Sequence, residues 1–221
     1  MTTLRVLEIF DSLQGEGYWT GAAMTFVRLA GCNAPESGLG CVAWCDTPDS
    51  WDRAAGKELE VAELVSRVQL PRLCLTGGEP LLQADSLGEL VVRAHNRGIR
   101  VHVETNGTVG PPSDVDRRFD WVTISPKPPD YAIVPEWVGF VDELKLVVDE
   151  HLEANTAERL AAACPEAVVF LQPEAGNDGV TGTCEGETGA YRESCRRAIA
   201  LVMEHPDWRL SLQVHKALGI P

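Results

Sequence analysis

Three cysteines stand close together in the run GCNAPESGLGCVAWCDT near the amino end of the sequence. Cys32, Cys41 and Cys45 fall within 14 residues, and the glycines and proline between the first two allow the chain to turn back on itself. Thiolates on such a loop can bind a soft metal or an iron–sulfur cluster. A [4Fe-4S] cluster held by three cysteines leaves one iron open to a further ligand, which suits catalysis.

A zinc loop and a set of unconnected thiols are the alternatives for these cysteines. Structural zinc usually takes four ligands from two closely spaced pairs. The other candidate ligands do not form a second pair, because they are scattered along the chain: His102, Cys164, Cys184 and Cys195. Cys74 lies in an apolar run, where a buried cysteine is the ordinary expectation. The spacing therefore favours an iron–sulfur cluster over zinc.

Glycines and polar residues follow three apolar runs further along the chain. They form the segments TGGEP (76–80), ETNG (104–107) and SPK (125–127). Since the carboxyl ends of parallel strands meet at one edge, we expect these segments to build one shared site. Gly77 and Gly78 allow a ligand to approach the backbone closely, although the pair also suits an ordinary strand-to-helix turn.

Two basic side chains interrupt predicted strands. Arg28 shares a strand face with Phe26, and a guanidinium there needs an anion such as a carboxylate, which it binds in bidentate fashion. A surface salt bridge is the alternative. Lys145 raises the same question, and its partner is open between cofactor, substrate and a structural carboxylate.

Two oxygen-bearing side chains, Asp46 and Thr47, come directly after Cys45. Ligands of this kind suit a hard cation such as Mg²⁺ that also contacts a carboxylate of the substrate. The alternative is a helix cap, since Thr47 precedes a proline.

Short apolar runs of strand character alternate with amphipathic helical stretches. We predict strands at residues 5–10, 25–30, 73–76, 99–104, 121–125, 143–148, 168–172 and 209–214. Helices are predicted around 61–68 and 87–94, from the recurrence of apolar residues, and over 151–164 and 191–204. Gly98 is placed to end the second helix. This alternation predicts a mostly parallel sheet.

The length favours less than a complete barrel. A full eight-stranded barrel takes about 250 residues, whereas this chain has 221, and the first ~55 hold two predicted strands but no clear helix. We therefore predict an α/β fold, a shortened and incompletely closed (βα) barrel of mostly parallel strands. No low-complexity linker divides the chain, so one domain over 1–221 is expected, with the cluster loop at 31–47.

The composition limits the classes of function. No apolar run approaches the ~20 residues that span a bilayer, so we expect no membrane span. The 33 acidic and 19 basic side chains give a net charge of −14, which would repel nucleic acid. Arg5 and Glu8 interrupt any secretory leader, so we expect a cytoplasmic protein with reduced cysteines.

Together the motifs resemble those of the radical S-adenosylmethionine (SAM) superfamily, and within it the 7-carboxy-7-deazaguanine synthase family. In chain order they are LQGEG (13–17), VRLAGCN (27–33), WCDT (44–47), TGGEP, ETNG, SPK, ELKLVV (143–148), LQP (171–173) and QVHKALGIP (213–221). They cover nearly the whole chain. One spacing departs from the superfamily pattern, because three residues instead of two separate Cys41 from Cys45; Trp44 still occupies the aromatic place.

The resemblance implies binding roles for particular residues. It assigns a [4Fe-4S] cluster to Cys32, Cys41 and Cys45, and magnesium to Thr47. It assigns SAM to Gly77, Gly78, Glu79, Glu104, Asn106, Ser125, Lys127 and Gln172. It assigns the substrate to Leu13, Gln14, Gly15, Glu16, Gly17, Arg28, Asp46, Thr76, Gly78, His215 and Pro221.

The resemblance also implies an activity and partners. The chain would be a lyase that converts 6-carboxy-5,6,7,8-tetrahydropterin to 7-carboxy-7-deazaguanine with loss of ammonia, in queuosine and deazapurine biosynthesis. A flavodoxin-like protein would supply electrons, and the chain would form a homodimer. Cofactor chemistry would carry the reaction while the protein orients the reactants.

Two rival functions remain open from the sequence. A radical SAM activase that generates a glycyl radical on a partner protein would need a protein-sized entrance, whereas LQGEG, Arg28 and the carboxyl-terminal motif favour a small enclosed substrate. A non-catalytic iron–sulfur or zinc module would leave TGGEP, ETNG and SPK without a role.

Overall fold

A computed structural model describes residues 2–111, 119–175 and 189–221. Its strands form one nine-stranded sheet in the order β3-β1-β2-β4-β5-β6-β7-β8-β9. Their bounds are β1 (Thr3–Leu13), β2 (Ala23–Leu29), β3 (Lys57–Glu60), β4 (Arg72–Gly77), β5 (Arg100–Thr105), β6 (Trp121–Ile124), β7 (Glu143–Val148), β8 (Val168–Pro173) and β9 (Arg209–Leu210). The predicted strands are present, but β3 was missed.

The sheet is mostly parallel and does not close. β1 runs antiparallel to both β2 and β3, and every other neighbouring pair of described strands is parallel. β3 and β9 lie at opposite ends of the strand order. The prediction of an incompletely closed α/β barrel is therefore confirmed. The predicted strand at 209–214 is wrong beyond Leu210, where the chain leaves the ladder and forms a short helix.

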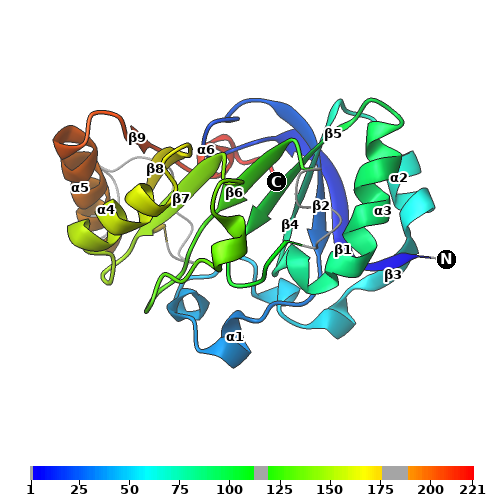
Figure 1. Ribbon diagram of the computed structural model, residues 1–221, viewed down its shortest axis with the longest axis horizontal. Coiled ribbons are helices and arrows are strands. Elements are labelled where there is room, and N and C mark those ends of the chain that lie inside the picture. Colours follow the sequence, from blue (N-terminus) through cyan, green and yellow to red (C-terminus); the bar gives the residue numbers. More distant parts are fainter. Residues whose placement is uncertain (1, 112–118, 176–188) are drawn as a thin grey trace.

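Helices flank the sheet at both ends. They are α1 (Ala34–Ser37), α2 (Val61–Arg67), α3 (Ala84–His95), α4 (Ala154–Ala163), α5 (Gly189–Glu204) and α6 (Val214–Leu218). Figure 1 shows α2 and α3 at one end of the sheet, α4 and α5 at the other, and α1 below the strands. The four helical predictions correspond to α2, α3, α4 and α5, and Gly98 follows α3 with a φ of 72°. No helix in the described ranges is long and apolar enough to cross a membrane.

Short 3-10 helices occupy much of the segment between β2 and β3. They are η1 (Gly40–Ala43), η2 (Pro48–Ser50) and η3 (Arg53–Ala55), with η4 (Pro80–Gln83) after β4 and η5 (Pro135–Trp137) after β6. The cluster loop therefore has little regular structure of its own, and tertiary contacts must fix it.

Alternating side chains separate the apolar core from the concave face of the sheet. On β7, Leu144, Leu146 and Val148 pack in a core shared with α4 and α5, while Lys145 and Val147 line the interior cavity. Successive residues of a strand point to opposite faces, so one strand serves both. One face of β7 thus packs in the apolar core, and the other face lines the cavity.

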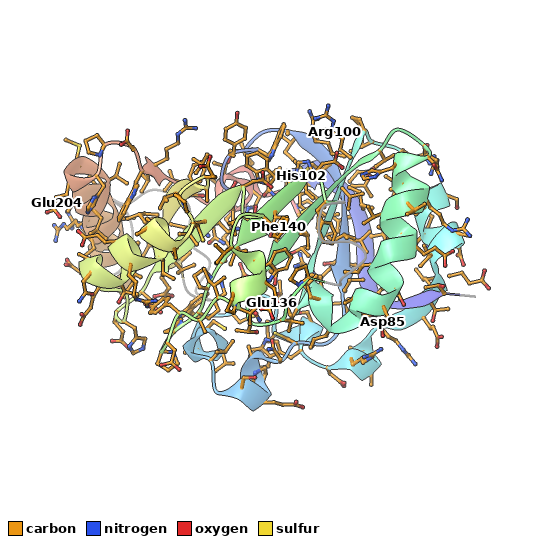
Figure 2. The ribbon with its side chains drawn as sticks, in the orientation of Figure 1. Asp85, Arg100, His102, Glu136, Phe140 and Glu204 are labelled. Carbon is orange, nitrogen blue, oxygen red and sulfur yellow. The ribbon has the colours of Figure 1, made fainter. Side chains whose placement is uncertain are left out.

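The amino and carboxyl ends of the parallel strands lie on opposite sides of the molecule. Figure 2 shows Arg100 and His102, near the amino end of β5, on the upper side, and Asp85, where α3 begins, on the lower side. The lower side carries the loops that leave the carboxyl ends of the parallel strands, and α1 lies there too. This is the side where a site is expected in such folds.

Candidate active site

A cavity of about 280 Å³ is lined by residues from the carboxyl ends of the strands and from the loops beyond them. Most predicted site residues line it: Leu13, Gln14, Gly15, Glu16, Arg28, Cys32, Cys41, Cys45, Asp46, Thr47, Thr76, Gly77, Gly78, Glu104, Asn106, Ser125, Lys127, Gln172, His215 and Pro221. Gly17 and Glu79 do not. Segments that are far apart in the sequence thus meet around one space.

The three cysteines of the loop face this cavity as free thiols. Burial, together with the neighbouring Glu79, Cys41 and Cys45, raises the pKa of the Cys32 thiol to about 11. Such a thiol becomes a thiolate when a metal centre supplies positive charge. In the described ranges no three His, Cys, Asp or Glu side chains converge on a single-ion site.

The remaining cysteines lie elsewhere. Cys74 is fully buried beside Met24 and Phe26, as expected of an apolar strand residue, and Cys164 is buried in the main core. Cys195, on α5, is disulfide-bonded, so the expectation that every cysteine is reduced is wrong there. Cys184 lies outside the described residues.

Thr47 directly precedes η2 at the N-cap position, but its side chain makes no capping hydrogen bond. Its Oγ1 instead lies 3.7 Å from the sulfur of Cys45. Asp46 pairs with the carboxyl-terminal segment, because Nζ of Lys216 lies 3.0 Å from its Oδ2. The cap alternative thus leaves the Thr47 hydroxyl unexplained, and the Asp46 carboxylate already has a cationic partner.

Asp149, immediately after β7, anchors the cluster loop. Its Oδ2 accepts a hydrogen bond from Nε1 of Trp44 at 3.2 Å, and its Oδ1 accepts one from the hydroxyl of Tyr131 at 2.9 Å. Asp149 is buried. It ties the residue before Cys45 to the loop that follows the SPK segment. The sequence analysis missed it, although a polar residue directly after a strand is the same signal that identified the other loops.

Gly77 and Gly78 allow the end of β4 to lie against β2 and the cluster loop. Gly77 has a φ of 133°, and a Cβ on Gly78 would come within 2.2 Å of the carbonyl oxygen of Gly31. The amides of Gly78 and Glu79 donate to the carbonyls of Leu29 and Gly31 at 3.1 and 2.8 Å. Backbone packing therefore accounts for both glycines, which also line the cavity.

The Glu79 side chain points away from the cavity and joins neighbouring elements. It is 1% exposed and accepts hydrogen bonds from Oγ1 of Thr105 at 2.7 Å, the amide of Asn106 at 2.8 Å and the amide of Leu81 at 3.1 Å. Burial raises its pKa against these contacts. As placed, the carboxylate holds the end of β5 and is not part of the cavity lining.

Asn106 of the ETNG segment and Lys127 of the SPK segment contact residues of the cluster loop. Nδ2 of Asn106 donates to Oδ1 of Asn33 at 2.9 Å. Nζ of Lys127 donates to Oγ of Ser125 at 2.8 Å and lies 5.2 Å from the centre of the Trp44 ring. Burial lowers the pKa of Lys127, while Cys41 and Cys45 oppose that shift. A cation thus stands beside the thiols.

Charged side chains line the cavity beside the LQGEG segment. Oε1 of Glu104 accepts from Nε2 of Gln14 at 2.9 Å, and Oε2 lies 3.4 Å from the hydroxyl of Thr76. Nζ of Lys145 lies 2.5 Å from Oε2 of Glu16 and 4.0 Å from Oε2 of Glu104. In this structure Lys145 therefore pairs with carboxylates of the chain.

Arg28 forms a surface salt bridge and also lines the cavity, so both environments expected for it are present. Its Nε lies 2.6 Å from Oε1 of Glu8 on β1, with the two side chains 20% and 50% exposed. The arginine also lines the cavity with Phe26. The surface salt bridge uses one edge of the guanidinium and leaves other N–H groups on the cavity side.

The carboxyl-terminal segment covers the LQGEG turn. The amide of Val214 donates to the carbonyl of Gly15 at 2.9 Å, and a Cβ on Gly15 would lie 2.0 Å from Nδ1 of His215. Oγ of Ser12 donates to the carbonyl of Pro221 at 2.6 Å. Glycine is thus required where the tail crosses the turn.

A second set of contacts joins the turn to β8. Oγ of Ser211 donates to Oε1 of Gln172 at 2.9 Å and accepts from the amide of Gly17 at 3.0 Å. Gly17 has a φ of 65°, and a Cβ there would meet Oε1 of Glu143 at 2.0 Å. Gly17 therefore shapes the turn without lining the cavity.

Known proteins resemble this chain along nearly its whole length. A 7-carboxy-7-deazaguanine synthase from Bacteroides thetaiotaomicron is 38% identical over 98% of this chain and 98% of its own. Proteins of the same name from Caulobacter vibrioides and Synechocystis sp. are 36% and 35% identical over 99% and 97% of this chain, and over 100% and 92% of their own lengths. The chain belongs to the 7-carboxy-7-deazaguanine synthase family. No family model matches it.

A solved structure supports the fold. The crystal structure of QueE from Escherichia coli matches with a TM-score of 0.73 and 24% sequence identity, covering 96% of this chain and 95% of that one. The resemblance to the 7-carboxy-7-deazaguanine synthase family is therefore confirmed in sequence, and the architecture in three dimensions.

Two residues of the carboxyl-terminal motif had no predicted role. Gln213 donates from Nε2 to Oε1 of Glu16 at 2.8 Å, and Lys216 pairs with Asp46. Both line the cavity. Their signal lay in the motif QVHKALGIP, but the sequence does not show which strands that motif crosses.

Proposed function

We propose that this member of the 7-carboxy-7-deazaguanine synthase family is a radical SAM lyase. Its reaction is the conversion of 6-carboxy-5,6,7,8-tetrahydropterin to 7-carboxy-7-deazaguanine with loss of ammonia. The observation that carries the proposal is the meeting of three free thiols, the glycine-rich end of β4 and the LQGEG turn around one cavity.

Cys32, Cys41 and Cys45 would hold a [4Fe-4S] cluster. When bound, the cluster and SAM supply the one-electron chemistry that no protein side chain provides. The cation of Lys127 lies beside the thiols, where it would offset the negative charge of thiolates and of the carboxylate of SAM. Glu104, Asn106, Ser125 and Gln172 line the same space and would bind the polar groups of SAM.

The other side of the cavity would hold the pterin. Arg28 presents N–H groups suited to the 6-carboxylate, while Gln14 and Glu16 present acceptors and a donor to the ring edge. His215 and Pro221 come from the tail that covers the turn. These residues would orient the substrate and exclude water, which fits a small molecule better than a partner protein.

The decisive experiment uses anaerobically reconstituted protein. Iron and sulfide content, SAM binding by equilibrium titration, and product formation by mass spectrometry are measured on one preparation. If the proposal is correct, the same preparation contains the cluster, binds SAM and forms 7-carboxy-7-deazaguanine. Cluster and SAM binding with no reaction of the pterin, but hydrogen abstraction from a protein glycine, would favour the activase. A cluster with no SAM binding would favour a non-catalytic module.

We also propose that Mg²⁺ contributes to turnover. Oγ1 of Thr47 is a cavity-lining oxygen, and Mg²⁺ commonly takes one or two protein oxygens and completes its shell with substrate and water. Removal of Mg²⁺ is expected to slow turnover more than it weakens SAM binding. Equal turnover with and without a chelator would remove the ion from the mechanism.

Three further proposals concern partners and compartment. A flavodoxin-like protein would supply the electron, because the cluster chemistry needs a reductant. A homodimer would cover exposed apolar side chains, among which are Leu13, Leu210, Leu212 and Leu218; size-exclusion chromatography with light scattering tests it. Cytoplasmic location would keep the three free thiols reduced, and fractionation of cells tests that.

A further inference from the structure

Lys145 is a buried cation of the cavity that the proposed function leaves without a role. Its side chain is 7% exposed, and its Nζ lies 2.5 Å from Oε2 of Glu16 and 4.0 Å from Oε2 of Glu104. A buried ammonium group needs such carboxylates to offset the loss of water. Lys145 is therefore fixed by carboxylates of the chain itself, and its effect on a ligand can pass through these neighbours.

Glu16 is the neighbour in closest contact. Lys145 donates to its Oε2, and Nε2 of Gln213 donates to its Oε1 at 2.8 Å. Each carboxylate oxygen has a second lone pair, so both oxygens can still accept a hydrogen bond from a ligand. The two donors hold the plane of the carboxylate in one orientation.

The charge state of Glu16 depends on this pairing. Burial acts to raise the pKa of Glu16, but Lys145 and then Gln213 outweigh it, and the pKa falls to about 2. At the pH of any cell the carboxylate is ionised, and an ionised carboxylate only accepts hydrogen bonds.

We infer that Lys145 is a positioning residue for substrate recognition, which keeps Glu16 ionised and aimed so that it accepts hydrogen bonds from adjacent N–H groups of the pterin ring. The inference rests on the proposed function, which assigns Glu16 to the ring edge. Because an acceptor-only group pairs with donors and repels another acceptor, it would select the 2-amino edge.

The backbone of the turn is held by groups other than Lys145, whose own hydrogen bond goes to the side chain of Glu16. Oε2 of Glu143 accepts from the amide of Tyr18 at 3.0 Å, the amide of Gly17 donates to Ser211, and Gln14 is held by Glu104. A change at Lys145 should therefore alter the charge of Glu16 while the turn stays in place.

Removal of the Lys145 charge would leave Glu16 in less favourable surroundings. Three basic groups interact with Glu16: Lys145 on β7, Lys127 on the SPK loop and His215 on α6. Two further carboxylates, Glu104 on β5 and Glu143 on β7, interact with Lys145. Two carboxylates would then stand near a buried third one. Without Lys145, burial dominates and raises the pKa of Glu16.

The test is the pH dependence of pterin binding by the reconstituted holoenzyme. Lys145→Met keeps the length of the side chain and removes the charge. The wild-type KM should show no titration from Glu16 between pH 6 and pH 8.5. In Lys145→Met the KM should rise by about tenfold as pH falls across that range, since protonation of Glu16 replaces an acceptor by a donor. Iron content and SAM affinity should match wild type.

Two matched variants separate positioning from general support. Lys145→Arg retains the cation and should restore the wild-type pH profile. Lys145→Met combined with Glu16→Gln should bind the pterin no more weakly than Glu16→Gln alone, because Lys145 acts through Glu16. A flat profile with wild-type KM in Lys145→Met, or additive losses in the double variant, overturns the inference.

A measurement on wild-type protein remains available if Lys145→Met does not fold. A pterin analogue without the 2-amino group should bind at least about tenfold more weakly than its parent, the loss expected when a buried acceptor is left unpaired; equal binding overturns the inference. If Glu16→Gln leaves the KM unchanged, the assignment of Glu16 to the substrate fails, and the inference fails with it. A flat pH profile with wild-type KM in Lys145→Met overturns only the inference and leaves the proposed function in place.

Discussion

Cys32, Cys41 and Cys45 line one cavity, whereas Cys164 packs in the apolar core. Alanine at any of the three cavity positions is expected to abolish the [4Fe-4S] signal, because a three-thiolate site cannot spare a ligand. Iron and sulfide analysis with electron paramagnetic resonance checks this. Cys164→Ala, which also removes a free thiol, should leave the signal intact. A full-strength cluster in Cys41→Ala would show that the long spacing hides another ligand.

Arg28 offers a second test at the scale of one side chain. Arg28→Ala is expected to raise the KM for the pterin by roughly 30-fold, since a lost charge-assisted contact costs about 2 kcal/mol or more. Iron content and SAM affinity should stay near wild type, because Arg28 is not among the thiol or SAM positions. Anaerobic steady-state kinetics measures the KM, and titration calorimetry with the substrate checks that binding itself is weakened.

Glu8 provides the matched control for Arg28. It contacts the same guanidinium but is half exposed, and exposed pairs contribute only about 0–1 kcal/mol. Glu8→Gln should therefore change the KM by no more than a few-fold. An equal effect of the two variants would make the salt bridge, and not a substrate carboxylate, the reason for Arg28.

Single residues also mark the limit of what the sequence could predict. Glu79 was expected beside SAM, and it does follow β4 at the correct edge, but its carboxylate turns to Thr105, Asn106 and Leu81. Position along a strand follows from the pattern. Side-chain direction depends on which donors the neighbouring loops present, and the sequence does not show that.

At the scale of elements, the loop after β7 controls the cluster loop through Asp149. Asp149→Asn would replace one carboxylate oxygen by an NH₂ group, which would face either the indole N–H of Trp44 or the hydroxyl of Tyr131. One hydrogen bond to a charged acceptor is then lost, which costs about 1.5–3 kcal/mol. We expect about tenfold weaker SAM binding or a matching loss of iron retention. Equilibrium titration and iron analysis measure both.

Trp44→Phe is the control for this anchor, because it removes the donor and keeps an aromatic ring. It should reproduce the effect of Asp149→Asn, and the double variant should add little to either. Full iron content and wild-type SAM affinity in Asp149→Asn would mean that the 3-10 helices fix the cluster loop without the anchor.

Which elements could be predicted depends on how much apolar surface they bury. β7 and α3 bury apolar residues at strand and helix spacing, so the pattern located both. β3 is exposed at three of its four positions and α6 buries none; both form through backbone hydrogen bonds and tail contacts. Hydrophobic periodicity carries no signal for such elements.

At the scale of the whole molecule, charge is distributed unevenly. The chain carries a net charge of −14, yet the cavity lining balances four basic residues against four acidic ones: Arg28, Lys127, Lys145 and Lys216 against Glu16, Asp46, Glu104 and Glu174. The excess negative charge therefore lies outside the cavity. An anionic ligand meets its least repulsive surroundings inside, and polyanions are kept from the outer surface.

The open side of the sheet makes the carboxyl-terminal segment part of the cavity. Residues 214–221 contact the LQGEG turn at Gly15, β1 at Ser12 and the cluster loop at Asp46. Deletion of 214–221 is expected to raise the KM for the pterin by tenfold or more, since two lost hydrogen bonds of about 1 kcal/mol each exceed the roughly 1.4 kcal/mol that a tenfold change needs. Iron content and SAM affinity should change by no more than about twofold, because within the described part of the chain no hydrogen bond or ion pair joins residues 214–221 to the three thiols or to the SPK segment.

Lys216→Met is the milder control for that deletion. The pair between Lys216 and Asp46 is partly exposed, at 22% and 41% for the two side chains, so its loss alone should change the KM by a few-fold at most. Steady-state kinetics and SAM titration on both variants separate two roles of the tail. A parallel loss of SAM affinity and pterin affinity in the deletion would show that the tail closes the molecule as a whole, whereas a loss confined to the pterin would identify it as the wall of the substrate side.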